Sequence, residues 1–558
     1  MTSIRPNVLL VIVDEWRAQA FGYRGDPNAH TPAIDEFAAE SIDFQNAVSG
    51  SPVCCPARAS MMTGQYPLNH GVFINDVELE PTGPTLAGTF RDHGYETGYI
   101  GKWHLYGSPA GWFERRGAFV PPDRRLGYDY WKAAECTHDY NESHYYEGDD
   151  PTRRTWSGYD ARAQTDDAVE FIEERAESDR PWFLTVSYGP PHFPLDSAPE
   201  EFRRQYRDRE IVLRDNVPPE RADEATRDLR GYYAHISAVD ECFGRLLEAV
   251  DDDVMVVFTS DHGDMLWSHG LEYKLMPWEE SIRVPLLIRR RERLEPRRST
   301  ALANSPDLMP TLLGFAGLES SQDLDGVDLS RSPGFQTALL SAPVPFSTMR
   351  WNGFSEYRGV WDGRFTYVET IEGAWLLYDN HDDPFQMRNR CGDPLLAAQQ
   401  RRLRDELGQW LARLGDQFLP APAYLKQAGL GHYFEVNEPL GTTSSPWGDW
   451  RSSSDRARAY SIDTPLEVLA ADPQAWAAIR RAWSDVGEVL GDQAKPEDSP
   501  RLVSMLRPSS LDPSVLNDLD GELIAVPVLR PELLERVAQG RGSTKADRLP
   551  DTLMAENR

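Results

Sequence analysis

The run Val8-Leu-Leu-Val-Ile-Val13, followed at once by Asp14 and Glu15, decides the fold of the chain. A continuous apolar run rich in β-branched residues is typical of a strand that is buried on both faces of a sheet. The same arrangement recurs along the chain, where apolar runs at 97–101, 182–188 and 254–259 end in polar or charged residues. These residues include Lys102, His104, His192, Asp261 and His262.

Helical patterns separate these runs. Residues 165–175 and 231–250 carry apolar side chains at the spacing of one helix face. Alternating strands and helices predict an α/β fold, with a large, mainly parallel sheet flanked by helices on both faces. Ligands of such sheets bind beyond the carboxyl ends of the strands, so we expect the polar residues that follow the four strands to lie around one site.

The stretch from Ser51 to Gly64 reads as a loop that runs into a short helix. Pro56 suits the first helical turn, and Gly64 suits the position that ends a helix. Cys54 therefore lies at or just before a helix N-terminus, where free N–H groups and the helix dipole favour an anion. Arg58 lies one turn further on and can point at the same place. This combination suits an oxyanionic substrate.

The sequence Cys54-Cys55-Pro56-Ala57-Arg58, continued by Thr63-Gly64, resembles the signature of the type I sulfatases of the alkaline phosphatase superfamily. The position of Pro56 selects Cys54 as the matching cysteine. The resemblance implies an alkaline phosphatase-like fold, and it implies that a formylglycine-generating enzyme oxidises this cysteine to formylglycine, whose hydrate is the nucleophile. An unmodified structural cysteine is the alternative.

Two pairs of strand-end residues match the family's metal site. With the oxygen of the residue at Cys54, the resemblance assigns one Ca²⁺ ion to Asp14, Glu15, Asp261 and His262, and hard divalent cations prefer such oxygen ligands. Glu15 and His262 depart from the commonest family residues, and a nitrogen ligand makes Mn²⁺ the alternative metal. Acidic strand ends that are merely solvated are the structural alternative.

Further motifs match the family's substrate-contacting residues. Gly101-Lys102-Trp103-His104-Leu105 resembles the Gly-Lys-x-His-Leu motif, while His192 and Lys274 match a histidine and a lysine of the family. Three more residues are candidates for binding the substrate: Asn75, His138 and His269. Residues 128–146, which include His138, are expected to form an aromatic loop that suits either a sugar or aryl group or a domain contact.

The resemblance implies hydrolysis of a sulfate monoester of an aryl alcohol or a carbohydrate. Asp261 would take a proton from the nucleophile, and Arg58, Lys102 and Lys274 would hold the sulfuryl oxygens. His192 or Lys274 would protonate the leaving alcohol, and His104 would assist the release of sulfate. A phosphonate monoester or phosphodiester hydrolase of the same superfamily is one alternative. A non-catalytic binding protein is another.

Composition restricts the partners and the location. The formal net charge of −31 and the pI near 4.8 argue against nucleic acid and anionic membranes as partners. Five cysteines in 558 residues make no disulfide framework. We see no secretory signal and no stretch long enough to cross a bilayer, so a cytoplasmic enzyme is expected.

Three regions are expected along the chain. Residues 1–345 form the catalytic α/β domain, residues 346–430 form a small α+β subdomain with antiparallel strands, and residues 431–558 form a helical extension. The extension carries apolar residues such as Trp447, Trp476 and Trp483 but no clustered ligands. We therefore expect it to mediate homo-oligomer contacts or to cover the active site.

Overall fold

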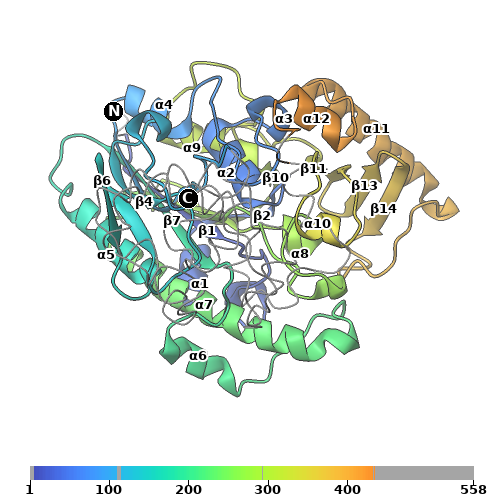
Figure 1. The fold of residues 1–558 in the computed structure, drawn as a ribbon, viewed down its shortest axis with the longest axis horizontal. Helices are drawn as coiled ribbons and strands as arrows, with labels where there is room; N and C mark the ends of the chain where they lie inside the picture. Colours follow the sequence, from blue (N-terminus) through green and yellow to red (C-terminus); the bar gives the residue numbers. More distant parts are fainter. Residues whose placement is uncertain (1–4, 110–114, 292, 432, 434–558) are drawn as a thin grey trace, which may run out of the picture. The chain divides into compact units, whose positions relative to one another are not determined.

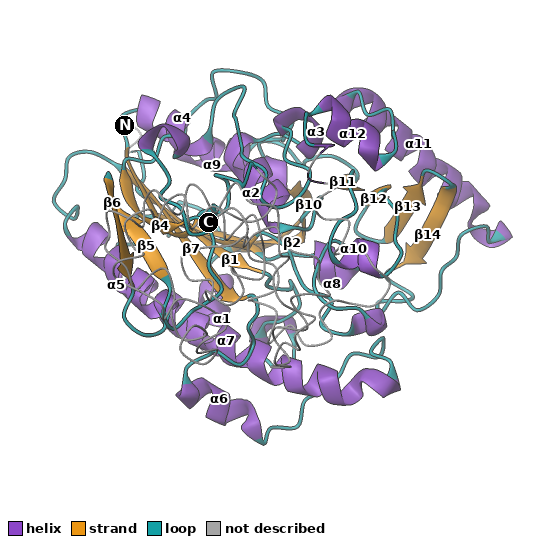
Figure 2. Cartoon of the chain, viewed as in Figure 1, coloured by secondary structure: helices purple, strands orange, loops and turns teal. Residues whose placement is uncertain are grey.

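The computed structural model describes residues 5–109, 115–291, 293–431 and 433. In this part of the chain ten strands form one sheet in the order β10-β2-β9-β8-β1-β7-β3-β4-β5-β6 (Figures 1 and 2). The strands are β1 (Val8–Asp14), β2 (Ile42–Val48), β3 (Glu96–Lys102), β4 (Tyr130–Ala134), β5 (His144–Glu147), β6 (Asp150–Thr155), β7 (Trp182–Pro191), β8 (Met255–Ser260), β9 (Leu286–Arg289) and β10 (Arg297–Asn304).

The centre of this sheet is parallel. Strand β1 lies between β7 and β8, and Val8 aligns with Phe183 on one side and Met255 on the other. Strand β3 continues the parallel order beyond β7, and β4 follows β3. Strands β9, β5 and β6 pair antiparallel with their neighbours. The expected α/β class with a mainly parallel sheet is confirmed.

The apolar run of β1 is buried on both faces of the sheet, as its sequence predicts. Val8, Leu10 and Ile12 belong to one core, which they share with residues of helices α2 (Cys54–Thr63), α4 (Leu86–Asp92) and α9 (Leu308–Ala316). The alternate residues of the strand belong to a second core with α1 (Pro32–Ala39), α5 (Asp160–Glu173) and α7 (Ala222–Ala249). Figure 1 shows these two groups of helices on opposite sides of the strands.

The carboxyl ends of the parallel strands meet at one edge of the sheet. Asp14 ends β1, Lys102 ends β3, and Asp261 follows β8 directly. His192 follows the last residue of β7. Because β7, β1 and β8 are neighbours and β3 lies next to β7, the sheet topology alone brings these four residues to one place.

A second sheet contains four antiparallel strands in the order β11-β12-β13-β14. These are β11 (Ala338–Ala342), β12 (Tyr357–Trp361), β13 (Phe365–Thr370) and β14 (Gly373–Asp379), and α11 (Ala397–Leu414) packs against them. Its antiparallel pairing agrees with the sequence. Strand β11 lies before the boundary expected at residue 345, and the division into catalytic domain and subdomain stays a prediction.

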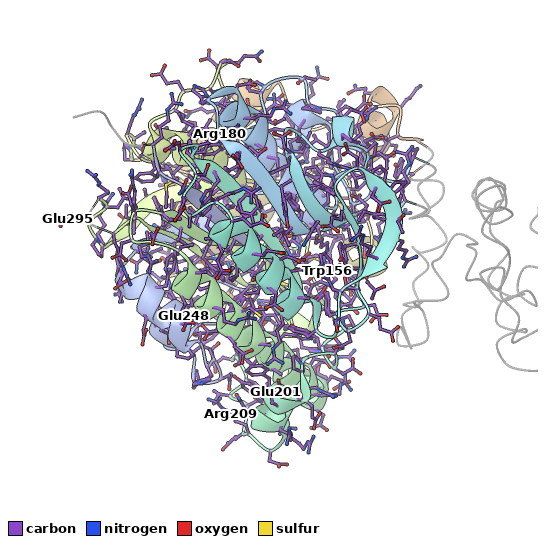
Figure 3. All side chains as sticks on the ribbon, turned by 90° about the vertical axis from the view of Figure 1, so that its left-hand side faces the viewer. Trp156, Arg180, Glu201, Arg209, Glu248 and Glu295 are labelled. Carbon is purple, nitrogen blue, oxygen red and sulfur yellow. The ribbon has the colours of Figure 1, made fainter. Side chains whose placement is uncertain are left out.

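Shorter helices complete the described part. They are α3 (Pro67–His70), α6 (Glu200–Arg207), α8 (Glu279–Ile282), α10 (Thr348–Trp351), α12 (Ala421–Gln427) and the 3-10 turns η1 (Gly22–Arg24), η2 (Pro122–Arg124), η3 (Pro219–Arg221), η4 (Ser268–Gly270), η5 (Ser305–Asp307) and η6 (Pro394–Leu396). Charged side chains such as Glu201 of α6 and Glu248 of α7 point outward (Figure 3). Within the described ranges, we find no helix of the length and apolarity that a membrane span requires.

The segment 128–146 differs from the loop that we expected. It contains β4 and the first part of β5, and its aromatic side chains Tyr128, Trp131 and Tyr140 are at most 3% exposed. Trp131 stacks on Tyr99 of β3, with ring centroids 5.5 Å apart. The prediction of a loop holds only for residues 128–129 and 135–143; the rest forms strands, and the large rings of the segment fill the core beside them. The extension that we expected at 431–558, including Trp447, Trp476 and Trp483, lies outside the described residues except for 431 and 433, so its role stays a prediction.

Candidate active site

The helix α2 carries the candidate nucleophile at its first residue. Val53 is extended, the helix begins at Cys54, and it ends at Gly64, whose φ of 66° is left-handed. Every residue of this helix is buried, so its N-terminus points into protein and not into bulk water. Because free N–H groups and the helix dipole favour negative charge, an anionic group at position 54 fits this place.

Asn75 lies beside this helix end. Its Oδ1 accepts a hydrogen bond from the backbone N–H of Cys55 at 3.0 Å. This bond satisfies one donor of the first helical turn and fixes the orientation of α2. The structure therefore brings Asn75 to the site, while contact between its amide and a substrate stays a prediction.

Arg58 and Lys102 share the carboxylate of Asp14. Lys102 Nζ lies 2.5 Å and Arg58 Nη2 lies 3.2 Å from Asp14 Oδ2, and Arg58 Nε lies 2.9 Å from Oδ2 of Asp261. All four side chains are buried. Burial raises the pKa of Asp14, but the charges of Lys102 and Arg58 outweigh burial and hold it below its usual range. Sequence reasoning missed Ser187 of β7, whose hydroxyl accepts from Arg58 Nη1 at 2.7 Å.

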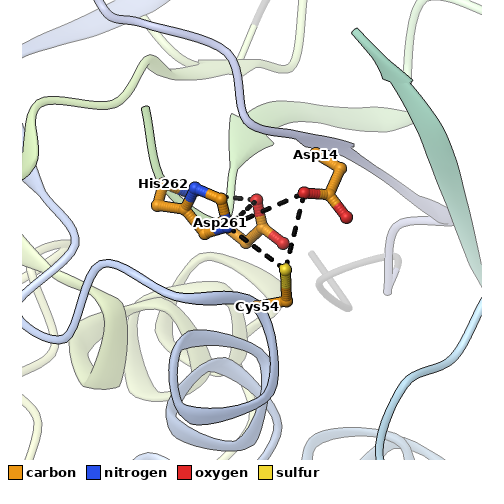
Figure 4. Close-up of side chains that lie close together, drawn as sticks. All are labelled: Asp14, Cys54, Asp261 and His262. Atoms are coloured by element: carbon orange, nitrogen blue, oxygen red, sulfur yellow. Dashed lines mark hydrogen bonds and ion pairs between the residues drawn. The ribbon is translucent and has the colours of Figure 1, made fainter. Parts of the chain in front are cut away.

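Asp14, Cys54, Asp261 and His262 form a buried group whose ligand atoms all lie within 4.8 Å of one another (Figure 4). His262 Nε2 lies 3.3 Å from Cys54 Sγ and 3.7 Å from an oxygen of each aspartate. The other ring nitrogen, Nδ1, lies 2.8 Å from the carbonyl of Gly263. When Nδ1–H donates to that carbonyl, Nε2 is the nitrogen that faces the cluster, which is the arrangement of a metal-binding histidine.

Glu15 adds a further carboxylate from a strained position. Its φ is 71°, its side chain is fully buried, and its two carboxylate oxygens make no hydrogen bond within the described residues. Lys274 Nζ lies 3.1 Å and His192 Nε2 lies 3.4 Å from this carboxylate. With Asp14, Asp261 and His262, Glu15 gives the site three buried carboxylates and one imidazole, and this donor set fits a divalent metal ion.

Lys274 and His192 form a pair beside Cys54. Lys274 Nζ lies 2.7 Å from His192 Nε2 and 3.4 Å from Cys54 Sγ. His192 Nδ1 lies 2.9 Å from the carbonyl of Phe193. Burial and the nearby lysine lower the pKa of His192 well below its usual value, so the imidazole is neutral and Nε2 accepts from the ammonium. The structure therefore places the proton of this pair on Lys274.

His104 lies next to the nucleophile with a left-handed backbone, at a φ of 58°. Its Nε2 lies 3.6 Å from Oδ1 of Asp76. Burial raises the pKa of Cys54, but Lys274, Lys102, His262 and His104 together lower it well below its usual value. Position 54 is therefore electrostatically prepared for an oxyanion or thiolate.

The two remaining histidines have different surroundings. His138 stacks on His192, with ring centroids 4.4 Å apart and planes inclined by 19°, so it borders the site. His269 lies 3.2 Å from Asn216 and stacks on Trp278 at 5.2 Å, and these contacts tie it to the surrounding fold. Within the described ranges no hydrogen bond, ion pair or ring contact joins His269 to the cluster, and its role in substrate binding stays a prediction.

Sequence reasoning also missed two rings next to this pair. Phe193 packs against His192 at 4.0 Å and against Tyr273 at 5.0 Å between centroids. Both rings are only half-buried. Phe193 and Tyr273 directly neighbour two of the predicted residues in the sequence, and this proximity was the one signal available.

Comparison with known proteins identifies the family. The family model "Sulfatase" matches residues 6–318, and the model "N-sulphoglucosamine sulphohydrolase, C-terminal" matches residues 268–413. An ulvan-active sulfatase of Formosa agariphila is 38% identical over 79% of this chain and 89% of its own length. An endo-4-O-sulfatase of Bacteroides thetaiotaomicron is 27% identical over 74% of this chain and 92% of its own length.

A solved structure agrees with the fold. The phosphonate monoester hydrolase of Agrobacterium radiobacter superposes with a TM-score of 0.58 at 25% identity, and the match covers 74% of this chain and 96% of that one. The alkaline phosphatase-like architecture is therefore shared with an enzyme that acts on a different ester. The sequence relatives named above are sulfatases, and they favour sulfate ester hydrolysis over phosphonate ester hydrolysis.

Proposed function

The chain belongs to the sulfatase family and is a sulfuric ester hydrolase, and from this premise we propose that it releases sulfate from a sulfated glycan, with Cys54 matured to formylglycine as its nucleophile. The observation that carries the proposal is the position of Cys54. Its sulfur lies at a buried helix N-terminus, 3.3 Å from His262 Nε2 and 3.4 Å from Lys274 Nζ. The formylglycine nucleophile of the family would develop negative charge here, and both the helix N-terminus and the nearby Lys274 ammonium would stabilise that charge.

The aldehyde that a maturation enzyme would produce from Cys54 supplies, once hydrated, two hydroxyl groups on one carbon. The residues around it are arranged to move protons and to hold charge. Arg58, Lys102 and Lys274 converge on this position from three different elements. Since charge on the sulfuryl oxygens rearranges during transfer, fixed cations in a buried site stabilise the transition state more than water would.

The leaving alcohol needs a proton, and the sequence leaves His192 and Lys274 as candidates. The neutral His192 accepts from Lys274 at 2.7 Å, so the ammonium is the proton donor of the pair. We propose that Lys274 gives the proton to the leaving oxygen and that His192 holds the ammonium in place. Asp261 stays the proposed proton acceptor near the nucleophile.

Asp14, Glu15, Asp261 and His262 would hold one divalent metal ion beside position 54. When bound, such an ion supplies positive charge to the sulfuryl group. Three carboxylates favour Ca²⁺, and the imidazole of His262 makes Mn²⁺ acceptable as well. The buried carboxylate of Glu15, next to Asp14 in the sequence, supports a cation at this place.

Two observations support a glycan over a small aryl sulfate. One relative that covers most of this chain is described as ulvan-active, and another acts as an endo-4-O-sulfatase. The half-buried rings of Phe193 and Tyr273 lie next to the proton donor, and aromatic rings suit the apolar face of a sugar. A formylglycine-generating enzyme and a second copy of this chain are the proposed protein partners.

The test compares substrates and cysteine variants on the full chain produced together with a maturation enzyme. We expect free sulfate from ulvan oligosaccharides at a higher kcat/KM than from a nitrophenyl sulfate, and far less turnover of a phosphodiester. Cys54→Ala should abolish release, while Cys391→Ala, a half-buried cysteine in another part of the fold, should keep it. Activity that survives Cys54→Ala, or a preference for the phosphodiester, would contradict the proposal.

A further inference from the structure

The backbone of His104 is fixed by one buried glutamate. The N–H of His104 donates to the carbonyl of Glu135 at 2.7 Å. The carboxylate of Glu135 accepts from three successive N–H groups, those of Leu105 at 3.2 Å, Tyr106 at 3.0 Å and Gly107 at 3.0 Å. These bonds hold the left-handed turn at His104, but they do not set the rotation of its ring.

The ring of His104 has one carboxylate in front of it. Both ring nitrogens are buried, and neither makes a hydrogen bond within the described residues. Asp76 Oδ1 lies 3.6 Å from Nε2, close enough for an ion pair and for a hydrogen bond after a small shift. When Nε2 carries its proton toward Asp76, Nδ1 keeps the lone pair that can accept a proton.

Asp76 is itself held from several directions. Arg116 Nε lies 2.9 Å from Oδ1 and Arg116 Nη2 lies 2.7 Å from Oδ2, a bidentate pair that fixes the plane of the carboxylate. The backbone of Asp76 is left-handed, at a φ of 63°. Its carbonyl accepts from Ser108 N–H at 2.7 Å and from the hydroxyl of Tyr433 at 3.0 Å. A carboxylate held so firmly is not a solvated turn residue.

We propose that Asp76, clamped by Arg116, is a positioning residue for His104, which sets the orientation and the tautomer of that imidazole. The proposal rests on the proposed function, because it takes His104 as the group that accepts a proton when sulfate is released. An imidazole whose Nε2–H faces a fixed carboxylate presents one defined nitrogen to the reaction. Asp76 touches neither Cys54 nor the metal-binding group in the contacts of the described residues, so it acts through His104.

The reaction has two halves, transfer of the sulfuryl group to position 54 and release of sulfate from it, and different residues serve each half. Transfer of the sulfuryl group depends on Arg58, Lys102 and Lys274, none of which contacts Asp76 in the described part of the chain. Release of sulfate depends on His104. Weakening Asp76 should therefore slow the second half and leave the first half, together with substrate binding, nearly unchanged.

The experiment is rapid mixing of matured full-length Asp76→Asn enzyme with a nitrophenyl sulfate. We expect kcat to fall roughly 10- to 100-fold, as for other residues that orient a catalytic side chain, and KM to fall by a similar factor, so that kcat/KM stays within about twofold of wild type. We also expect a burst of about one nitrophenol per active site before the slow steady state, because only the second half is slowed. Arg116→Gln keeps the carboxylate of Asp76 but removes the guanidinium that holds it. This variant should show a smaller burst and a smaller loss of kcat than Asp76→Asn.

The matched control is Asp325→Asn. Asp325 is a structural carboxylate that accepts from Tyr66 N–H at 2.9 Å and from Asn69 Nδ2 at 2.7 Å, and no hydrogen bond or ion pair of the described residues joins it to His104. It should lose thermal stability without a burst. If Asp76→Asn loses activity only in proportion to folded protein, shows no burst, or loses as much kcat/KM as kcat, the inference is wrong. A wild-type enzyme that releases no sulfate would instead contradict the proposed function.

Discussion

Lys274 Nζ lies 2.7 Å from Nε2 of His192, and this imidazole turns its Nδ1 to the carbonyl of Phe193 at 2.9 Å. When His192 Nδ1–H donates to the carbonyl of Phe193, Nε2 has a lone pair and accepts a hydrogen bond from the ammonium of Lys274. Burial and the lysine lower the pKa of His192, while Cys54 and Glu15 outweigh burial and raise the pKa of Lys274. A charged lysine next to a neutral histidine is the natural donor to a leaving oxygen.

Lys274→Ala should therefore make the rate more sensitive to the leaving group. On sugar or alkyl sulfates, whose alcohols need a proton, we expect a loss of roughly 10²–10⁴-fold in kcat/KM. On nitrophenyl sulfate the loss should be smaller, since that leaving group departs as an anion. The measurement is the slope of log kcat/KM against the leaving-group pKa for wild type and variant. An equal loss across the series would mean that Lys274 only binds the sulfuryl group. The comparison variant is His192→Asn, which keeps Lys274 but removes the imidazole that holds its ammonium.

Lys102→Ala should remove roughly 2–4 kcal/mol of transition-state stabilisation for sulfate transfer, by analogy with other lost oxyanion donors. Lys102 Nζ is buried and bonds Asp14 at 2.5 Å, so its removal also leaves that carboxylate with one cation fewer. Any side activity on a phosphodiester should fall less, because a diester carries less negative charge. The measurement is steady-state kcat/KM of wild type and variant on a sulfate ester and on a phosphodiester. Equal losses of kcat/KM on both substrates would argue against Lys102 as a sulfate ligand.

Metal uptake should depend on pH through His262. Burial lowers the pKa of this imidazole, but Asp261 and Cys54 outweigh burial and raise it to about 9. Below that pH the metal must displace a proton from Nε2, so affinity should increase as the pH rises from 6 to 9, with release of up to one proton per ion from this residue. Calorimetry with Mn²⁺ in buffers of different ionisation enthalpy measures that proton. His262→Asn should bind metal with a weaker pH dependence, and an unchanged proton release in this variant would exclude His262 as a ligand.

His70 should make helix α2 sensitive to acid. Burial lowers the pKa of His70 to about 3, against an ordinary value near 6.5, and its Nε2 lies 3.0 Å from the hydroxyl of Ser60 in α2. A depressed folded-state pKa contributes stability that is present above pH 6.5 and is lost as the pH falls toward 3. His70→Gln should therefore reduce the drop in Tm between pH 7 and pH 4.5. A drop as large as in wild type would show that other groups cause the acid sensitivity.

The sequence predicts the fold well where the physics is local. The apolar run at Val8 and its strand-end aspartate indicate a buried parallel strand, and the topology of such sheets brings Asp14, Lys102, His192 and Asp261 together without further information. The start of α2 at Cys54 and its end at Gly64 follow from proline and glycine preferences in the same way.

The sequence is less informative where long-range contacts decide. Tyr128 and Trp131 resemble a binding loop in composition, yet they pack into the core because β4 pairs with β3. Asp76 looks like half of a turn signal, and only the fold brings Arg116 and His104 to its carboxylate. Pairings over such distances have no signature in a single sequence.

The central claim is that position 54 carries an aldehyde in the working enzyme, and peptide mass spectrometry of an active preparation tests it most directly. The tryptic peptide that contains Cys54 and Cys55 should show the thiol-bearing side chain replaced by an aldehyde at 54 and an intact thiol at 55. The converted fraction should rise in proportion to kcat across preparations made with different amounts of the maturation enzyme. A fully active preparation in which Cys54 is still a thiol, or conversion at Cys55 instead, would contradict the account.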